Sequence, residues 1–326
     1  MKQFAKMLCA CVLMACAPLA MAQRAAGPGP SAPAGPGGPG APGRGKPPPA
    51  PPPFQPTGVK HGTVSAVWYH SPVTNGERRM LVYTPPGYET SKKKYPVLYL
   101  FHGGGGNEDN WVDSGLAHVG LDNLIAGGRL MPMIVAMPNA NWDMPAAPKY
   151  SPPAVAGTNP NTGGPGGQAP MGLDMGKAVD DIVHGEIPYI EKHYRVQKGR
   201  ENRAIAGLSM GGGIAISVGL MRLDQFAWIG EFSAGLFGGV SGAAYEPFDA
   251  EALAPGFFSN AAATNRKIKL LYLSCGTEDP RVSFTEETAR DINRRGVNAT
   301  FASFPGGHEW SVWRDSLVDF GSKLFR

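Results

Sequence analysis

The chain has 326 residues, of which 42% are hydrophobic and only 17% charged, and its formal net charge is +4. Three of its cations lie in the N-terminal tail, so the rest is nearly balanced, and no basic patch with interleaved aromatic residues occurs. These features argue against a nucleic-acid-binding protein. Beyond the N-terminus no uninterrupted apolar run is long enough for a membrane helix, so we expect no stable membrane span.

The first residues have the pattern of an export signal. Lysines flank an apolar stretch at 7–19, and small residues at 20–22 form a cleavage site. This pattern predicts a signal peptide at 1–22 and a secreted or periplasmic protein. A lipoprotein signal with Cys16 as the lipidated residue is the alternative, but Met14 fits that motif poorly.

Composition divides the rest of the chain into two parts. Residues 23–56 are almost all Pro, Gly and Ala, which favours a disordered tether because such a segment buries little apolar area. Residues 57–326 have the length of one catalytic α/β domain. Three of the four cysteines lie in the signal, so Cys275 is alone in the mature chain, and we expect it to be a buried structural thiol.

The folded part reads as strands that alternate with helices. The Asn75-Gly76 turn predicts a hairpin between its first two strands. Strands are expected at 62–70, 78–83, 96–101, 131–137, 204–206, 226–232, 268–274 and 299–304. Helices are expected at 116–126, 173–193, 212–220, 284–295 and 310–325. This order predicts the α/β class, with a mostly parallel sheet covered by helices on both faces.

A sharp turn at Ile205–Gly213 carries the main chemical signal. Gly207-Leu208-Ser209-Met210-Gly211 matches G-x-S-x-G, between an apolar strand and a small apolar helix. In this nucleophile elbow the serine is strained, and a Cβ two residues before or after it would collide across the turn. The helix N-terminus also favours a developing negative charge. Ser209 is therefore predicted to be the nucleophile.

A serine nucleophile needs a base and an acid. In the α/β-hydrolases, which carry this type of elbow, the acid follows the serine in the chain and the histidine follows the acid. His308 is the only histidine after Ser209, and it lies in a glycine-rich loop after the last strand, so it is predicted to be the base. The acid should follow the strand 268–274, where Glu278 and Asp279 are adjacent. We favour Asp279, because Pro280 fixes the turn, and keep Glu278 as the alternative.

Acyl transfer also needs donors for the oxyanion. One is the N–H of Met210, and the second should come from the glycine-rich loop 102–106 after the strand 96–101. No Lys-Ser/Thr pair follows these glycines, so a phosphate-binding loop is rejected. His102 is expected to make structural hydrogen bonds. Neither a cofactor nor a metal ion is expected.

Five stretches, 82–88, 95–106, 203–213, 275–279 and 306–313, resemble the esterase-D-like branch of the α/β-hydrolases. The resemblance spans about residues 60–326 and is strongest to the feruloyl esterases and acetyl xylan esterases of carbohydrate esterase family 1. It implies the α/β-hydrolase fold. It also implies that Ser209, Asp279 and His308 form the catalytic triad, and that Gly104 and Met210 are the oxyanion donors.

These features favour a secreted serine carboxylesterase that hydrolyses feruloyl- or acetyl-type esters, as small molecules or linked to polysaccharide, through an acyl-enzyme. A siderophore-lactone esterase or an acyltransferase would use the same fold and triad. A cytosolic S-formylglutathione hydrolase conflicts with the export signal. A catalytically silent carbohydrate-binding module is disfavoured, because it would have no need for the complete set of catalytic groups.

Specificity is expected to depend on the long Pro- and Gly-rich segment 139–171, which is longer than expected of the family. Segments of this length are usually functional or flexible, and this one follows a sheet strand, so it should approach Ser209. Trp142 and Met144 are predicted to bind substrate by covering an aromatic acyl group. Alternatively, Trp142 only anchors the segment to the domain.

Overall fold

The computed structural model describes residues 53–142, 174–235 and 248–326, all within one unit that spans residues 49–326. The predicted signal peptide, the tether up to residue 52 and most of the segment 139–171 lie outside the described residues. The strands are β1 (Thr63–Ser71), β2 (Gly76–Thr84), β3 (Val97–Phe101), β4 (Ile134–Pro138), β5 (Arg203–Leu208), β6 (Trp228–Phe232), β7 (Leu270–Gly276) and β8 (Thr300–Phe304). The α-helices are α1 (Asn110–Asp113), α2 (Ala117–Ala126), α3 (Met175–Asp181), α4 (Ile187–His193), α5 (Met210–Met221), α6 (Ala250–Leu253), α7 (Ala261–Lys267), α8 (Val282–Arg294) and α9 (Trp310–Lys323).

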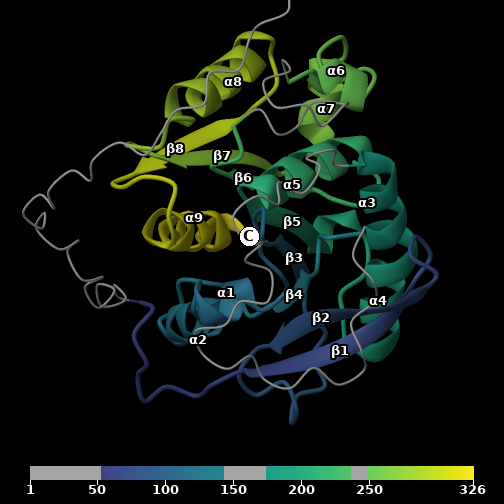
Figure 1. The fold of residues 1–326 in the computed structure, drawn as a ribbon, viewed down its shortest axis with the longest axis vertical. Helices are drawn as coiled ribbons and strands as arrows, with labels where there is room; N and C mark the ends of the chain where they lie inside the picture. The colour runs from purple at the N-terminus through teal and green to yellow at the C-terminus, as the bar shows by residue number, and fades with distance from the viewer. Residues whose placement is uncertain (1–52, 143–173, 236–247) are drawn as a thin grey trace, which may run out of the picture. The chain divides into compact units, whose positions relative to one another are not determined.

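The strands form one sheet in the order β1-β2-β4-β3-β5-β6-β7-β8 (Figure 1). Strands β3 to β8 run parallel, and the β1–β2 hairpin lies antiparallel at one edge. Asn75 has the positive φ (49°) that the predicted hairpin turn requires. The carboxyl ends of all parallel strands therefore meet at one edge of the sheet, where α/β enzymes place their active sites.

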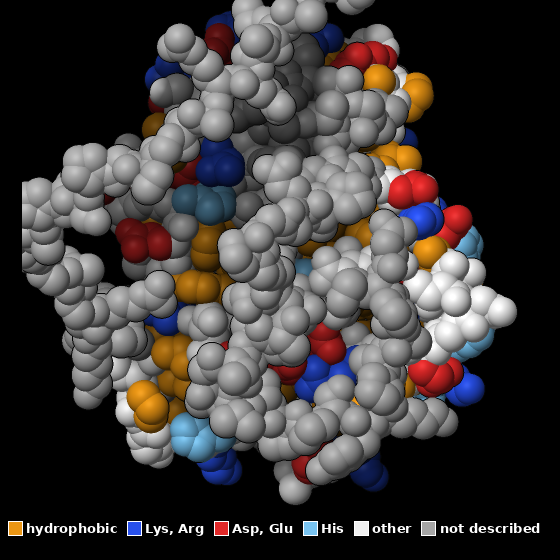
Figure 2. Space-filling model, viewed as in Figure 1, with side chains coloured by type: hydrophobic (Ala, Val, Ile, Leu, Met, Phe, Trp, Pro, Cys, Tyr) orange, Lys and Arg blue, Asp and Glu red, His pale blue; other side chains and the backbone are white. Residues whose placement is uncertain are grey.

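Charged side chains of both signs lie next to one another on the face viewed in Figure 2. In the part of that face that the structure describes, no extended patch of one sign is visible. Among the described helices, none combines the length and the hydropathy needed to cross a membrane.

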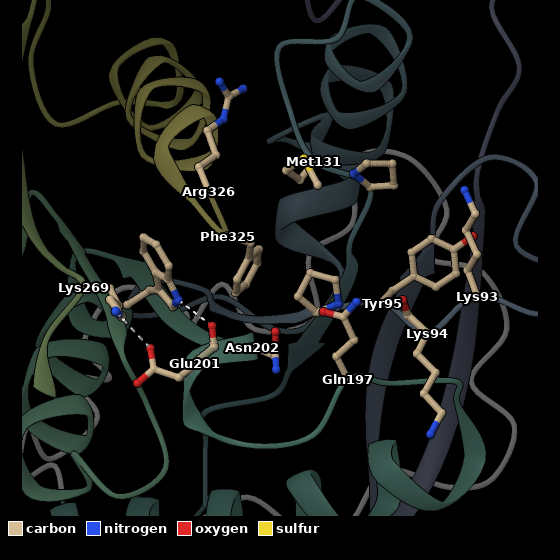
Figure 3. Close-up of a pocket in the computed structure, with 13 residues that line it drawn as sticks. Lys93, Lys94, Tyr95, Met131, Gln197, Glu201, Asn202, Lys269, Phe325 and Arg326 are labelled. Carbon is tan, nitrogen blue, oxygen red and sulfur yellow. Dashed lines mark hydrogen bonds and ion pairs between the residues drawn. The ribbon is translucent and has the colours of Figure 1, made fainter.

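A cavity of about 550 Å³ opens at the amino ends of the parallel strands. Ser209, which follows β5, lies at the opposite edge of the sheet, where the strands have their carboxyl ends. Pro96, Trp228 and Phe325 supply apolar lining. The cations at its rim do not converge, because Lys93, Lys94 and Arg326 point in different directions (Figure 3). This cavity therefore has the form of a surface hollow without a built polar site.

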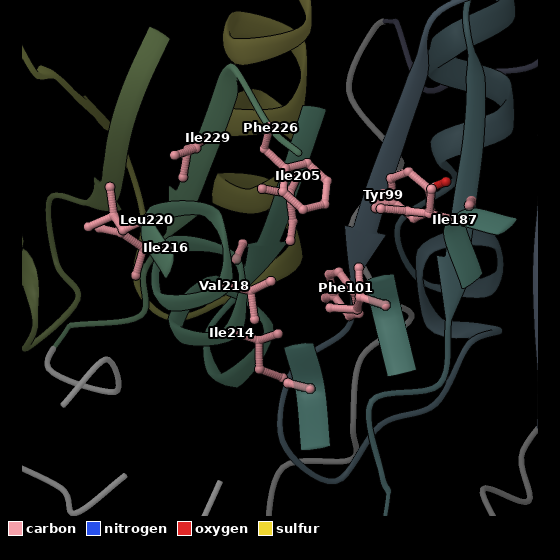
Figure 4. Packing of buried hydrophobic residues seen from close by; sticks show 14 of the residues in the cluster. Tyr99, Phe101, Ile187, Ile205, Ile214, Ile216, Val218, Leu220, Phe226 and Ile229 are labelled. Atoms are coloured by element: carbon pink, nitrogen blue, oxygen red, sulfur yellow. The ribbon is translucent and has the colours of Figure 1, made fainter. Parts of the chain in front are cut away.

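Helices cover both faces of the sheet. Helices α1, α2 and α9 pack on one face, and α3, α4, α5 and α8 on the other. On the second face, Ile214 and Val218 of α5 pack against Phe101 and Ile205 of the central strands (Figure 4). Every residue of β5 is buried, because the strand lies mid-sheet between two helix layers. The predicted α/β architecture is confirmed.

Two details differ from the expected elements. Strand β4 begins at Ile134 instead of residue 131, because Pro132 cannot donate to the sheet and Met131 is exposed. The expected helix 173–193 contains a π-helical turn, η1 (Ile182–Glu186), in which the N–H of Ile187 bonds to the carbonyl of Ile182. Pro188 supplies no N–H for the regular helical bond, which accounts for the wider turn.

Helices α1, α6 and α7 were not expected from the sequence. The side chain of Asp249 caps α6, and that of Asn260 caps α7. An Asp or Asn directly before an alanine-rich stretch is the local signal that could have located α6 and α7.

The folded part begins earlier than residue 57. Phe54 is fully buried against α2, where a Cβ on Gly120 would lie 2.4 Å from its ring. Asn123 of α2 binds the carbonyls of Pro53 and Gln55. Residues 53–56 thus pack on the domain, because one aromatic residue interrupts the Pro-, Gly- and Ala-rich composition of the expected tether.

Candidate active site

Ser209 stands at the sharp turn between β5 and α5. Its backbone angles, φ 51° and ψ −121°, lie where a side chain is strained. The Ser209 N–H donates to the carbonyl of Phe232 (2.7 Å), and the Ser209 carbonyl accepts from Gly213 (3.1 Å). Neighbouring structure therefore holds a conformation that the residue would not adopt alone, and Ser209 remains only half-buried at the carboxyl edge of the sheet.

The glycines on either side of Ser209 have the steric role that the sequence predicts. A Cβ on Gly207 would lie 2.4 Å from the carbonyl carbon of Gly211. A Cβ on Gly211 would lie 2.4 Å from the carbonyl oxygen of His102. Both distances are far below a tolerable contact, so any larger residue would force the turn apart.

Two hydrogen bonds join Ser209, His308 and Asp279. His308 Nε2 lies 3.0 Å from Ser209 Oγ, and His308 Nδ1 lies 2.7 Å from Asp279 Oδ2. The carboxylate fixes the tautomer in which Nδ1 donates to Asp279, so Nε2 can accept the proton of Ser209. The structure thus brings together three residues that are distant in the sequence, in the geometry of an activated serine.

Burial distinguishes the two adjacent carboxylates. Asp279 is 1% exposed, whereas Glu278 is exposed. Burial opposes the ionisation of Asp279, but hydrogen bonds from Arg281 and His308 outweigh it, and the pKa of Asp279 lies below its ordinary value. Asp279 is therefore ionised and faces His308, while Glu278 lies outside this contact.

The glycine-rich loop after β3 lies directly against the elbow. A Cβ on Gly103 would be 3.4 Å from Ser209 Cβ, and a Cβ on Gly104 would be 3.9 Å from Met210 Cβ. Gly104 is exposed, and Gly105 has a positive φ of 71°. The two predicted donor residues, Gly104 and Met210, are thus neighbours across the turn that carries Ser209.

His102 has the structural role expected of it. Its Nδ1 donates to the carbonyl of Gly103 (2.8 Å), and its Nε2 accepts from the N–H of Ala140 (2.9 Å). Burial lowers the pKa of the imidazole, which keeps it neutral and suited to one donated and one accepted bond. Cys275 is also buried, and burial raises the pKa of its thiol to about 12, so it is a structural thiol as predicted.

The side chain of Trp142 is directed into the protein interior. It is 7% exposed, belongs to the hydrophobic core, and its Nε1–H donates to Asp181 Oδ2 (2.8 Å). This position favours the alternative expectation, that Trp142 anchors the segment to the domain, because an indole N–H gains more from a buried carboxylate than from solvent. Met144 lies outside the described residues.

Three features of the site were missed from the sequence. Arg281 donates to Asp279 Oδ1 through Nη1 (3.2 Å) and through its backbone N–H (3.0 Å), and Nη1 lies 3.4 Å from His308 Nδ1. Trp313 packs edge-on against the His308 ring, with the centroids 5.0 Å apart. Glu231 is a buried carboxyl within β6, and burial raises its pKa to about 8. A lone glutamate inside an apolar strand is the signal that could have revealed the third feature.

Among the described residues, no cluster of His, Cys, Asp or Glu has the geometry of a metal site. The eight-stranded sheet, the strained elbow and the joined serine, histidine and aspartate together define the α/β-hydrolase fold. The model of the Esterase family matches residues 71–323, and the chain belongs to this family.

Two similar proteins are named as esterases. The endo-1,4-beta-xylanase/feruloyl esterase of Xylanibacter ruminicola is 28% identical over 273 residues, which are 82% of this chain and 32% of that protein. An esterase of Mycobacterium tuberculosis is 32% identical over 149 residues, which are 45% of this chain and 26% of that protein. The chain therefore spans about a third or less of the length of these two relatives.

A solved structure covers more of the chain. The carbohydrate esterase family 1 ferulic acid esterase of Anaeromyces mucronatus, determined with ferulic acid, superposes with a TM-score of 0.64 at 26% identity. The superposition covers 83% of this chain and 93% of that one. The predicted resemblance to feruloyl esterases of this family is confirmed.

Proposed function

We propose that this protein is a serine carboxylesterase that hydrolyses feruloyl- or acetyl-type esters. The observation that carries the proposal is the hydrogen-bonded series Ser209–His308–Asp279 at the carboxyl edge of the sheet. An isolated serine hydroxyl is a weak nucleophile, and this series supplies both a proton acceptor and the group that orients it.

In the first half-reaction Ser209 Oγ attacks the ester carbonyl carbon and gives its proton to His308 Nε2. The carbonyl electron pair moves onto oxygen, and Asp279 stabilises the imidazolium that forms. The N–H groups of Gly104 and Met210 are the proposed donors to this oxyanion, assisted by the N-terminus of α5.

The tetrahedral intermediate then collapses. The carbonyl re-forms, the ester C–O bond breaks, and His308 returns the proton to the leaving alcohol, which leaves an acyl group on Ser209. Water enters, gives a proton to His308, and attacks the acyl carbon; the acid is released and Ser209 recovers its proton. An acyltransferase would differ only in admitting an alcohol in place of water.

The substrate class rests on the similar proteins. One is a ferulic acid esterase determined with ferulic acid, and another combines xylanase and feruloyl esterase in its name. We therefore assign feruloyl or acetyl esters, free or linked to plant polysaccharide, as the proposed substrates. The N-terminal pattern at residues 1–22 supports export, to the periplasm or the medium.

The purified chain and its Ser209→Ala variant test this function on p-nitrophenyl acetate, methyl ferulate and acetylated xylan. We expect Ser209→Ala to lower kcat by about four to six orders of magnitude, because only the oxyanion donors and substrate binding remain. Ser65→Ala, at an exposed serine of β1, is the matched control and should retain full activity. A Ser209→Ala protein that kept a tenth of the turnover would refute the assignment.

A further inference from the structure

A buried arginine lies outside the proposed catalytic groups. Arg78 of β2 is 4% exposed and is the register partner of Tyr69 on β1. A buried guanidinium is costly unless charge and hydrogen bonds compensate it, so its partners indicate what it does.

Two of those partners are backbone carbonyls of one loop. Arg78 Nη2 donates to the carbonyl of Asn139, and Nη1 donates to the carbonyl of Asn141 (3.1 Å). The rigid fork of a guanidinium can hold two carbonyls at a fixed separation, which a lysine ammonium cannot. Arg78 thus sets the backbone of residues 139–142, the segment that follows β4.

On its other side, the Arg78 side chain lies beside buried carboxyl groups from α3 and η1. Arg78 Nε lies 3.4 Å from Asp181 Oδ2, which also accepts hydrogen bonds from Tyr69 (2.7 Å) and Trp142 (2.8 Å). Glu186, at the end of the π-helical turn η1, lies 3.4 Å from the Tyr69 hydroxyl. Burial and the nearby Asp181 raise the pKa of Glu186, which favours its neutral form. The ion pair of this cluster is therefore the one between Arg78 and Asp181.

The segment 139–142 in turn holds the glycine-rich loop after β3. The Ala140 N–H donates to His102 Nε2 (2.9 Å), and His102 Nδ1 donates to the carbonyl of Gly103 (2.8 Å). Asn141 Nδ2 donates to the carbonyl of Gly106 (2.9 Å). Both ends of the loop 103–106 are therefore tied to the backbone that Arg78 fixes.

This loop contains Gly104, the proposed oxyanion donor beside Met210. We propose that Arg78 is a positioning residue: through the carbonyls of Asn139 and Asn141 it sets the glycine-rich loop at the distance from Ser209 that oxyanion stabilisation requires. The inference rests on the proposed esterase function. It assigns to Arg78 an effect on the transition state, beyond its contribution to folding.

Arg78→Lys is the discriminating variant, because it keeps the charge beside Asp181 and removes only the fork. Arg203→Lys is the matched control. Arg203 is also buried, 6% exposed, and is paired with Glu191 (2.7 Å) and the Gln225 carbonyl (2.9 Å), but it begins β5 at the opposite edge of the sheet from Ser209. Active sites are counted with a fluorophosphonate, so that kcat refers to folded, competent protein.

For p-nitrophenyl acetate we expect Arg78→Lys to lower kcat per titrated site about ten- to a hundredfold and to change KM less than twofold. The reason is that displaced oxyanion donors stabilise the transition state less well, whereas substrate binding does not depend on them. The shape of the pH–kcat profile should be unchanged, because Arg78 does not touch the histidine or its aspartate. Arg203→Lys should keep the wild-type kcat. Asn141→Ala, at a partly exposed residue, should lower kcat in the same manner.

The proposal is overturned if Arg78→Lys keeps the wild-type kcat per titrated site, or loses no more than Arg203→Lys. It is also overturned if Asn141→Ala has no effect on kcat. A wild-type protein without esterase activity would instead refute the proposed function, so the two failures are distinguishable.

Discussion

The Arg281 guanidinium lies 3.2 Å from Asp279 Oδ1, while the other oxygen of that carboxylate binds His308. The backbone N–H of Arg281 donates to the same Oδ1 at 3.0 Å. One carboxylate thus receives two donors from a single residue and a third from the imidazole. These donors fix both the charge and the orientation of Asp279 before a substrate arrives.

The first prediction separates the two adjacent carboxylates. Asp279→Asn should lower kcat on p-nitrophenyl acetate by about four orders of magnitude, because His308 loses the partner that holds its tautomer. Glu278→Gln is the matched control and should leave kcat nearly unchanged, since that side chain is exposed. The reverse ranking in parallel kinetics would transfer the role to Glu278.

The second prediction concerns Arg281 and pH. The pKa of Asp279 is lowered in the folded protein, so its ionisation stabilises the fold above the ordinary aspartate pKa, and this contribution is lost as the pH falls through the folded value. Arg281→Gln should therefore be less stable than wild type at pH 7. The difference should narrow as the pH falls below about 4. Urea unfolding from pH 7 to pH 3 measures it, and a difference that widened on acidification would contradict this account.

The third prediction concerns Glu231. Burial raises its pKa to about 8, so its neutral form stabilises the fold, and that contribution is lost as the pH rises from the unfolded value through 8. Glu231→Gln keeps an acceptor for the Ala234 N–H and cannot ionise. Between pH 5 and pH 9 the free energy of unfolding of the wild type should fall by on the order of a few kcal/mol relative to that of the variant. Guanidinium unfolding at both pH values provides the measurement, and parallel losses in the two proteins would count against it.

The fourth prediction follows from the inward direction of Trp142. Trp142→Ala should destabilise the fold by about 3–5 kcal/mol, because it removes a buried aromatic ring and a donor to Asp181. Turnover of methyl ferulate and p-nitrophenyl acetate should fall by the same factor. A selective loss on methyl ferulate would restore Trp142 as part of the acyl pocket.

The fifth prediction concerns the start of the domain. A chain that begins at Pro53 should be as stable and active as one that begins at residue 23. Phe54→Ala should lower the free energy of unfolding by about 3 kcal/mol, because it leaves a cavity where the ring packs against α2. Lys60→Ala, at an exposed residue, is the control in urea unfolding. An unchanged midpoint for Phe54→Ala would show that residues 53–56 are dispensable after all.

Local signals were sufficient for most of the elements and for the order of the site residues along the chain. The G-x-S-x-G turn is recognisable because its steric demand falls on neighbouring residues: Gly207 and Gly211 must lack a Cβ for the chain to turn at Ser209. The strand and helix periods likewise depend on nearby residues, so the alternation and the positions of His308 and the acid after their strands could be predicted from the sequence.

Only the tertiary structure decided which way side chains face and what they meet. Asp279 and Glu278 have the same chemistry, and burial against His308 and Arg281 separates them. From the sequence, Trp142 could equally face a substrate or anchor its segment, whereas in the structure its N–H binds the buried Asp181. Arg78 gave no sequence signal, because its partners lie more than 60 residues away along the chain. Burial and long-range pairing depend on how distant segments pack, which no local pattern contains.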